Sequence, residues 1–267
     1  MNAVLRQGLN LVLAPLMWVC SSLGFIFEGA RSPSDMSDAN SSLLVPSGIA
    51  FSIWLPIFAL CITYGIIQAL PKNSDRSVYQ IIGRWSAAGF AGVCLWGLIN
   101  AFAPVTQGFD YAQWGTAIIF VPTVIFLVKA MLLSNVHRDE LKGIERIATL
   151  GGLSLIAGWC SIAVFLNWAP QTVRLLGDLG LSAEITCILI AALATIWACF
   201  ISWRSGGNWI YAFPILWGLT FALVSIWGME TRYLALIVAL IAAVGILALT
   251  TYRASNRLPS SRITKSL

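Results

Sequence analysis

Tryptophans and asparagines within apolar stretches are the residues of this chain best suited to chemistry with a ligand. Trp54, Trp96 and Trp159 each lie a turn or more inside an apolar run. Asn100 and Asn167 lie near the ends of two of these runs. An indole ring offers a large flat apolar surface, and an amide supplies a hydrogen bond that orients a bound molecule. These residue types therefore predict a pocket for a hydrophobic, planar small molecule.

The same residue types also have a structural interpretation, which the sequence leaves open. Asn100 and Asn167 can each bond a neighbouring helix, a contact worth roughly 1 kcal/mol. Asn167 follows Trp159 by eight residues, about 80° further round a helix, so the two can line adjoining sides of one groove. A tryptophan near a membrane interface usually anchors its helix among lipid headgroups. That role is favoured for Trp114, Trp168, Trp203, Trp209 and Trp227.

Patterns typical of enzyme active sites and metal centres are missing from the sequence. His137 is the single histidine, and there is no paired carboxylate, no Gly-x-Ser-x-Gly and no phosphate-binding loop. All the cysteines lie in apolar runs, where Cys behaves as a small hydrophobe, and no C-x-x-C spacing occurs. We therefore expect neither an enzyme nor a metal site nor a disulfide framework, and no required cofactor.

The elements that position these residues must be membrane helices, because the composition excludes a soluble globule. Of 267 residues, 58% are hydrophobic and 10% charged, and the mean hydropathy is +0.83. A soluble domain carries about 25% charged residues. A membrane-spanning helix needs about 20 apolar residues, and eight stretches qualify: 8–28, 47–70, 82–104, 112–134, 147–169, 183–203, 209–228 and 232–252. The sequence predicts an all-α integral membrane protein, an eight-helix transmembrane bundle.

The basic residues predict how this bundle is oriented. The net charge is +5, but Lys and Arg fall in short loops, so we expect the lipid bilayer and not nucleic acid as partner. Alternate loops hold twelve basic residues on one side and three, namely Arg31, Arg174 and Arg232, on the other. This asymmetry predicts that both termini are cytoplasmic, and short loops favour a bacterial inner membrane. Lys129 is the one charge expected inside a span, where it can snorkel.

Two further features of the spans bear on function. The first stretch contains no cleavage site typical of a signal peptide before Glu28, so we expect a retained helix. Pro56, Pro122 and Pro214 lie within the second, fourth and seventh stretches. Prolines there can mark bending segments, which leaves a secondary transporter of a neutral metabolite as the alternative function. A structural partner of another membrane protein is a third interpretation.

Two motifs resemble those of a known family. The second stretch begins Pro46-x-Gly48-x-x-Phe51-x-x-Trp54, which resembles the second-helix signature of the tryptophan-rich sensory protein, or translocator protein (TspO/MBR), family. The fifth stretch contains Trp159-x-x-x-Ala163-x-x-Leu166-Asn167, which matches that family's fifth-helix spacing. The resemblance covers residues 8–169. It implies a five-helix core in residues 1–169, three additional helices in 170–252 and a basic tail in 253–267.

The resemblance also implies a function and a set of site residues. It implies a membrane receptor, sensor or carrier for a tetrapyrrole such as haem or protoporphyrin, with a regulatory or stress-signalling role. The ligand contacts it implies are Trp54, Trp96, Asn100, Trp159 and Asn167, with Phe51 and Ala163 beside them and Pro46 and Gly48 shaping the start of the second helix. The three additional helices can cover one flank of the core or replace a dimer interface, so a homodimer stays open.

Overall fold

The computed structural model describes residues 1–31, 42–102, 111–231 and 233–257, and of residues 111–113 only the backbone. These described residues contain helices and no strand. The helices are α1 (Ala3–Ser21), α2 (Leu23–Ile26), η1 (Gly48–Ile53), α4 (Trp54–Ala69), η2 (Pro71–Asn73), α5 (Ser77–Phe102), α6 (Tyr111–Val136), η3 (Arg138–Glu140), α7 (Gly143–Arg146), η4 (Ile147–Gly151), α8 (Gly152–Gly177), α9 (Ala183–Arg204), α10 (Trp209–Trp227) and α11 (Leu234–Ser255).

Eight helices among the described residues are long and apolar enough to cross a membrane. Two of these spans combine neighbouring elements. One joins η1 to α4 over Gly48–Ala69, and the other joins α7, η4 and α8 over Gly143–Gly177. The all-α fold with eight spanning helices is therefore confirmed.

The first five spans form a closed ring. Going round it, α1 packs on α4, α4 on α8, α8 on α6, α6 on α5, and α5 on α1. Glycines allow the closest of these approaches. A Cβ at Gly65 of α4 would lie 2.8 Å from the Asn10 carbonyl oxygen of α1, and one at Gly92 of α5 would collide with Thr123 of α6. Close backbone packing of this kind stabilises helix pairs in membranes, where lipid competes for apolar contact.

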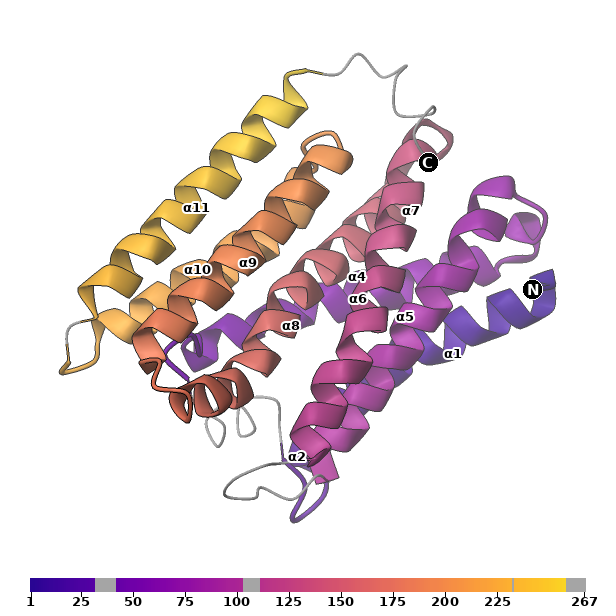
Figure 1. Cartoon of the computed structure of the whole chain (residues 1–267). Coiled ribbons are helices and arrows are strands. Elements are labelled where there is room, and N and C mark those ends of the chain that lie inside the picture. The colour runs from indigo at the N-terminus through magenta and orange to yellow at the C-terminus, as the bar shows by residue number, and fades with distance from the viewer. Residues whose placement is uncertain (32–41, 103–110, 232, 258–267) are drawn as a thin grey trace.

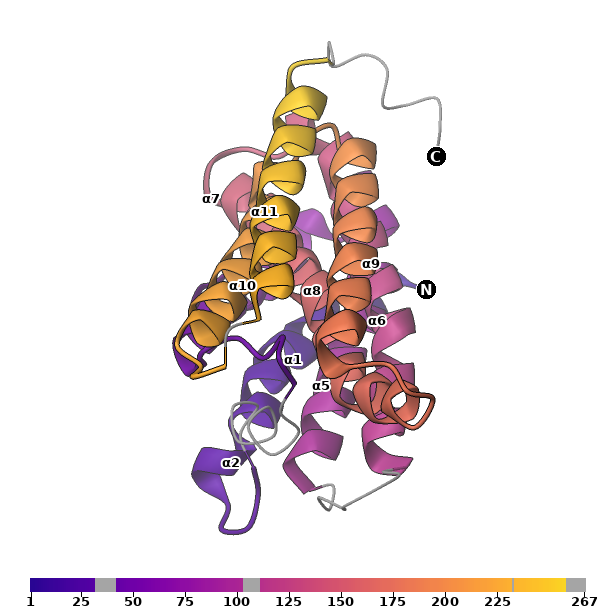
Figure 2. The same ribbon diagram turned by 60° about the vertical axis from the view of Figure 1, so that its left-hand side comes forward.

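The last three spans lie on one flank of this ring. Figure 1 shows α9, α10 and α11 (orange to yellow) on one side of α8, and α1, α5 and α6 on the other. In Figure 2, turned by 60°, the same three helices stand beside α8 again. Both α9 and α10 pack on α8, and α11 packs on both of them. A Cβ at Gly158 of α8 would collide with the Tyr211 carbonyl oxygen of α10, so this glycine permits the contact. Of the two predicted roles for these helices, the structure shows that they cover a flank of the core.

Several helix boundaries differ from the prediction, and this changes which charges lie inside a span. The fifth span, for example, is Gly143–Gly177 instead of 147–169. The side chain of Asn2 accepts a hydrogen bond from the Leu5 amide, so α1 begins at Ala3 instead of residue 8 and ends at Ser21 instead of residue 28. Helix α5 begins at Ser77 instead of residue 82. The expectation that Lys129 is the one charge inside a span was therefore wrong. The spans of the described residues also include Arg6, Arg84, Glu145, Arg146, Arg174, Glu184, Arg204 and Arg253.

The prolines do not interrupt their helices. Pro15, Pro122 and Pro214 lie inside α1, α6 and α10, which each continue through the proline, and α8 contains a further one, Pro170. Neighbouring helices make such prolines tolerable in a bundle. Arg232 and the predicted tail from residue 258 onward lie outside the described residues.

Candidate functional site

Aromatic side chains from four helices of the ring meet toward the end where α4 begins and α5 ends. We call this set the aromatic cluster, and it consists of Phe51, Trp54, Phe58, Trp96, Phe120 and Trp159. Its three tryptophans come from α4, α5 and α8 and are 7%, 7% and 2% exposed. The structure thus brings together the tryptophans that the sequence singled out, and it adds Phe58 and Phe120, which the sequence analysis missed.

Trp54 lies at the centre of the cluster. Its ring stacks on Phe58 with centroids 5.0 Å apart and planes 11° from parallel. It meets Trp159 edge-on at 6.1 Å, and Trp96 at 6.5 Å. Phe51 meets the same Trp159 ring edge-on at 6.1 Å. These are favourable aromatic geometries, and they leave the rings in mutual contact.

Asn167 joins two helices through the cluster. Its Oδ1 accepts a hydrogen bond from Trp96 Nε1 at 3.1 Å, which connects α8 to α5. Its Nδ2 donates to the carbonyl oxygen of Ala163, one turn earlier in α8, at 2.8 Å. Both polar atoms of this side chain are therefore engaged within the protein, as the structural interpretation of Asn167 expects.

Three other buried N–H donors at this end of the ring have no acceptor among the residues that the structure describes. Trp54 Nε1, Asn100 Nδ2 and Gln171 Nε2 are buried and make no hydrogen bond. Asn100 follows Trp96 by one turn of α5, and Gln171 follows Asn167 by one turn of α8. The sequence analysis missed Gln171, although its four-residue spacing from Asn167 places both on one helix face.

The chain that precedes α4 is held by α10. Trp217 Nε1 of α10 donates to the Ala50 carbonyl oxygen at 3.0 Å, and the Ser47 amide donates to the Phe221 carbonyl oxygen at 3.3 Å. Pro46 is buried, whereas Gly48 is exposed and a Cβ there would meet nothing within 4 Å. The additional helices therefore help to position η1, and with it Phe51, against the core.

A polar cluster lies at the opposite end of α1, α4 and α5. Asn10 Nδ2 donates to the carbonyl oxygens of Arg6 and Gly83, at 3.0 and 2.8 Å, and Asn10 Oδ1 accepts from Ser86 Oγ at 2.6 Å. Ser86 also bonds the Tyr64 hydroxyl at 2.9 Å. The Arg6 guanidinium, 2% exposed, donates through Nη2 to two carbonyl oxygens of the α4–α5 connection. We refer to these residues as the polar cluster. Its bonds fasten three helices of the ring.

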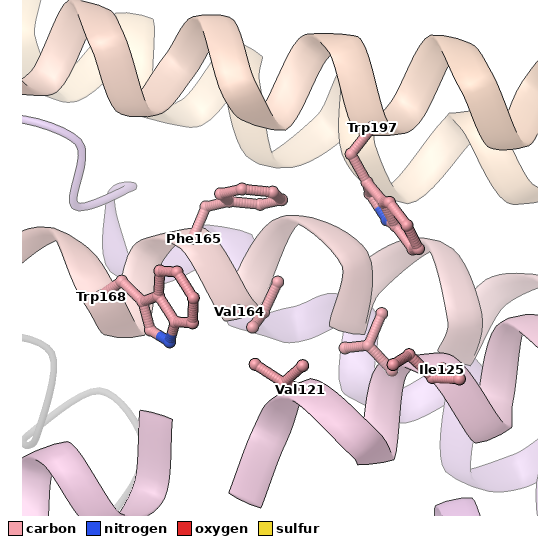
Figure 3. A pocket seen from close by; sticks show the side chains of 7 residues that line it. Val121, Ile125, Val164, Phe165, Trp168 and Trp197 are labelled. Atoms are coloured by element: carbon pink, nitrogen blue, oxygen red, sulfur yellow. The ribbon is translucent and has the colours of Figure 1, made fainter. Parts of the chain in front are cut away.

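Outside the ring, two adjoining cavities open between α6, α8 and α9. The first, of about 170 Å³, is drawn in Figure 3 and is lined by Val121, Val124, Ile125, Val164, Phe165, Trp168 and Trp197. The second, of about 300 Å³, is lined by Ile125, Val128, Lys129, Leu132, Leu133 and Trp197. Trp168, which the sequence favoured as a headgroup anchor, lines the first cavity and donates to the Ala117 carbonyl oxygen at 3.2 Å.

Comparison with known proteins identifies a family. In the part of the chain that the structure describes, no three His, Cys, Asp or Glu side chains group as a metal site would require. No curated protein and no solved structure matches the chain. A sequence model of the family described as TSPO-like protein matches residues 7–252. The match runs from α1 into α11, whereas the motif resemblance covers residues 8–169. The chain is therefore an integral membrane protein that belongs to the TSPO-like protein family.

Proposed function

We propose that this protein is a membrane receptor or sensor that binds a hydrophobic, planar ligand at the aromatic cluster. One observation carries the proposal: Trp54 Nε1 and Asn100 Nδ2 are buried donors without an acceptor, beside a set of packed indole rings. The family membership of the chain supports a receptor or sensor over other classes of membrane protein. The proposed activity is binding and signalling, and it requires no catalytic group.

A buried hydrogen-bond donor without an acceptor lowers the stability of the free protein. A buried N–H group without an acceptor costs roughly 1–3 kcal/mol, and the surrounding lipid offers none. In the polar cluster, Asn10 and Ser86 pair their polar atoms fully within the protein. A ligand with carbonyl or carboxylate oxygens would accept hydrogen bonds from Trp54 and Asn100 and so recover this free energy. The unpaired donors therefore favour a ligand that combines a flat apolar body with oxygen acceptors.

A tetrapyrrole such as haem or protoporphyrin has this combination. Its macrocycle is planar and apolar, and its carboxylates accept hydrogen bonds. Because Trp54 and Phe58 are already stacked, their rings must separate for the macrocycle to enter, and stacking on the ligand then replaces their stacking on one another. Phe51, Trp96 and Trp159 would supply further ring contacts, and Asn167 would hold Trp96 in place.

The remaining expectations form part of the same proposal. We place both termini in the cytoplasm of a bacterial cell, with the protein in the inner membrane and a role in stress signalling. A homodimer stays a prediction. The alternative of a secondary transporter rested on bending at Pro56, Pro122 and Pro214, and it stays the alternative. Pro122 and Pro214 lie inside continuous helices, whereas Pro56 lies two residues after the change from η1 to α4.

The proposal is tested by titrating the detergent-purified protein with protoporphyrin and with haem. Ligand absorbance and tryptophan quenching are followed for wild type, Trp54→Phe and Asn100→Leu. Loss of one hydrogen bond donated to the ligand should weaken binding about 5- to 10-fold. Trp209→Phe is the matched control, because Trp209 is exposed on α10, 44% accessible and outside the cluster. It should bind like wild type.

Two outcomes would overturn the proposal. One is that neither tetrapyrrole binds with a Kd below about 100 μM. The other is that Trp54→Phe and Asn100→Leu bind both ligands as tightly as Trp209→Phe does.

A further inference from the structure

The two cavities between α6, α8 and α9 adjoin one another. They share two lining residues, Ile125 of α6 and Trp197 of α9. We call their combined lining the α6–α9 groove. Along α6 it extends from Val121 to Leu133, about 18 Å of helix, which slightly exceeds the roughly 15 Å depth of one leaflet. The groove thus has the length of a lipid acyl chain lying along the bundle.

The aromatic walls of this groove are held in place by hydrogen bonds. Trp168 Nε1 donates to the Ala117 carbonyl oxygen of α6, and Trp197 Nε1 donates to Ser161 Oγ of α8 at 3.1 Å. Tyr211 of α10 donates to the same Ser161 hydroxyl at 3.1 Å. The indole nitrogens are engaged with the protein, so the rings present apolar surface to the groove (Figure 3). A site with walls fixed in advance loses little entropy when it is filled.

Positive charge gathers at one end of the groove. Lys129 lines it, and its Nζ lies 4.2 Å from the centroid of the Trp85 ring. The Arg84 Cζ lies 4.8 Å from the same ring. Within the described residues neither cation pairs with a carboxylate, and Trp85 Nε1 is buried without an acceptor. Two cations without a carboxylate partner therefore lie at the Trp85 ring, and the N–H group of that ring also lacks an acceptor.

The depth of these charges matches a lipid headgroup region. Lys129 lies seven residues before the end of α6, and Arg84 lies seven residues after the start of α5. The two positions lie at the same end of the α5–α6 pair, about two turns inside it. Long basic side chains reach from such positions to the interface.

We propose that the α6–α9 groove binds an anionic phospholipid, with its phosphate at Arg84, Lys129 and Trp85 Nε1 and one acyl chain along the groove. The negative headgroup matches the two cations, and the acyl chain matches the apolar lining. A zwitterionic lipid brings its own cation and gains less from this site, and a small anion leaves the groove unfilled. The proposal is independent of the aromatic cluster and of its ligand.

The test is native mass spectrometry of the delipidated protein, titrated in detergent with phosphatidylglycerol or with phosphatidylcholine of the same chains. Wild type should retain one tightly bound phosphatidylglycerol and little phosphatidylcholine. Each basic residue near a headgroup contributes about fivefold in affinity, so the double variant Arg84→Gln, Lys129→Gln should bind phosphatidylglycerol about 25-fold more weakly. Arg253→Gln, which removes one positive charge from an exposed position near the end of α11, is the control and should bind like wild type.

A second variant tests the groove without changing any charge. Ile125 is 49% exposed and belongs to both cavities, so Ile125→Trp should fill the groove while the helix stays packed. It should weaken phosphatidylglycerol binding at least fivefold with Arg84 and Lys129 intact. The proposal is overturned if phosphatidylcholine binds as tightly as phosphatidylglycerol, if Ile125→Trp binds like wild type, or if inorganic phosphate alone displaces the lipid. It is also overturned if a correctly folded double variant, checked by circular dichroism, binds like Arg253→Gln.

Discussion

The two ends of α1, α4 and α5 differ in how their buried polar side chains are hydrogen-bonded. At one end, the polar cluster buries Asn10, Tyr64 and Ser86 and joins them into one hydrogen-bonded network. At the other end, Trp54 of the aromatic cluster and the nearby Asn100 are buried, and among the described residues no atom accepts a hydrogen bond from Trp54 Nε1 or Asn100 Nδ2. The helices and the surrounding hydrocarbon are the same, so the environment does not explain the difference.

This difference separates a structural role from a binding role. In a membrane, an unpaired polar group lowers stability, whereas a paired one fastens helices together. A network with nearly all its bonds made has little left to offer a ligand, as at Asn10. The exception in the polar cluster is Arg6 Nε, which is buried and has no hydrogen-bond partner among the described residues. Donors left open beside stacked rings lower stability in the free protein, and the proposed ligand would pair them. We therefore propose packing as the role of the first end and ligand recognition as the role of the second.

Among the variants that test this comparison, Asn10→Leu should lower the free energy of unfolding most. This side chain takes part in three hydrogen bonds, and its loss removes one partner each from Ser86 Oγ and the Gly83 carbonyl oxygen, which keep their bond to one another. We expect the free energy of unfolding to fall by about 2–4 kcal/mol, measured by denaturant titration in detergent. Tetrapyrrole affinity of the folded fraction should be unchanged, and a selective loss of binding would contradict the assignment.

A smaller difference in stability is expected between Trp96→Phe and Trp54→Phe. Trp96→Phe removes a hydrogen bond to Asn167, whereas Trp54→Phe removes an N–H that has no partner. Both variants lose the same ring volume, so the difference between them isolates the hydrogen bond. Trp96→Phe should be less stable than Trp54→Phe by about 1 kcal/mol, from thermal unfolding followed by circular dichroism. Equal stabilities would show that the Trp96–Asn167 bond contributes nothing.

The smallest effect on stability is expected for Asn100→Leu, the counterpart of Asn10→Leu at the other end. Replacing an amide that has an unpaired Nδ2 by an apolar group of similar size should leave the free energy of unfolding unchanged or raise it by up to about 1 kcal/mol. The same denaturant titration measures it, while ligand binding weakens as described above. A loss as large as that of Asn10→Leu would erase the distinction between the two ends.

Much of the fold followed from local sequence. Length and hydropathy predicted eight membrane helices, and eight helices among the described residues are long and apolar enough to be such spans. Boundaries were less accurate: α5 begins five residues before the predicted start, because the polar residues Ser77 and Gln80 belong to its first turn. Hydropathy reports contact with lipid and does not report where a helix stops.

The candidate site was predictable in its residue types but not in its bonding. Trp54, Trp96 and Trp159 were chosen because they lie inside their spans, and they meet in the structure. Asn100 and Asn167 were equivalent in the sequence, each an amide near the end of a span. Only the structure shows that Asn167 of α8 pairs with Trp96 of α5 while Asn100 keeps an open donor.

By itself, the sequence determined that this chain spans a membrane eight times and carries ring-rich motifs on the second and fifth spans, because these properties depend on residues near each other in the chain. The tertiary structure alone decided which buried polar atoms are satisfied. It also decided that Arg6 is buried and bonded to the α4–α5 connection, and that α6, α8 and α9 leave a groove lined by Lys129. Those facts depend on neighbours contributed by other helices, and no local pattern records them.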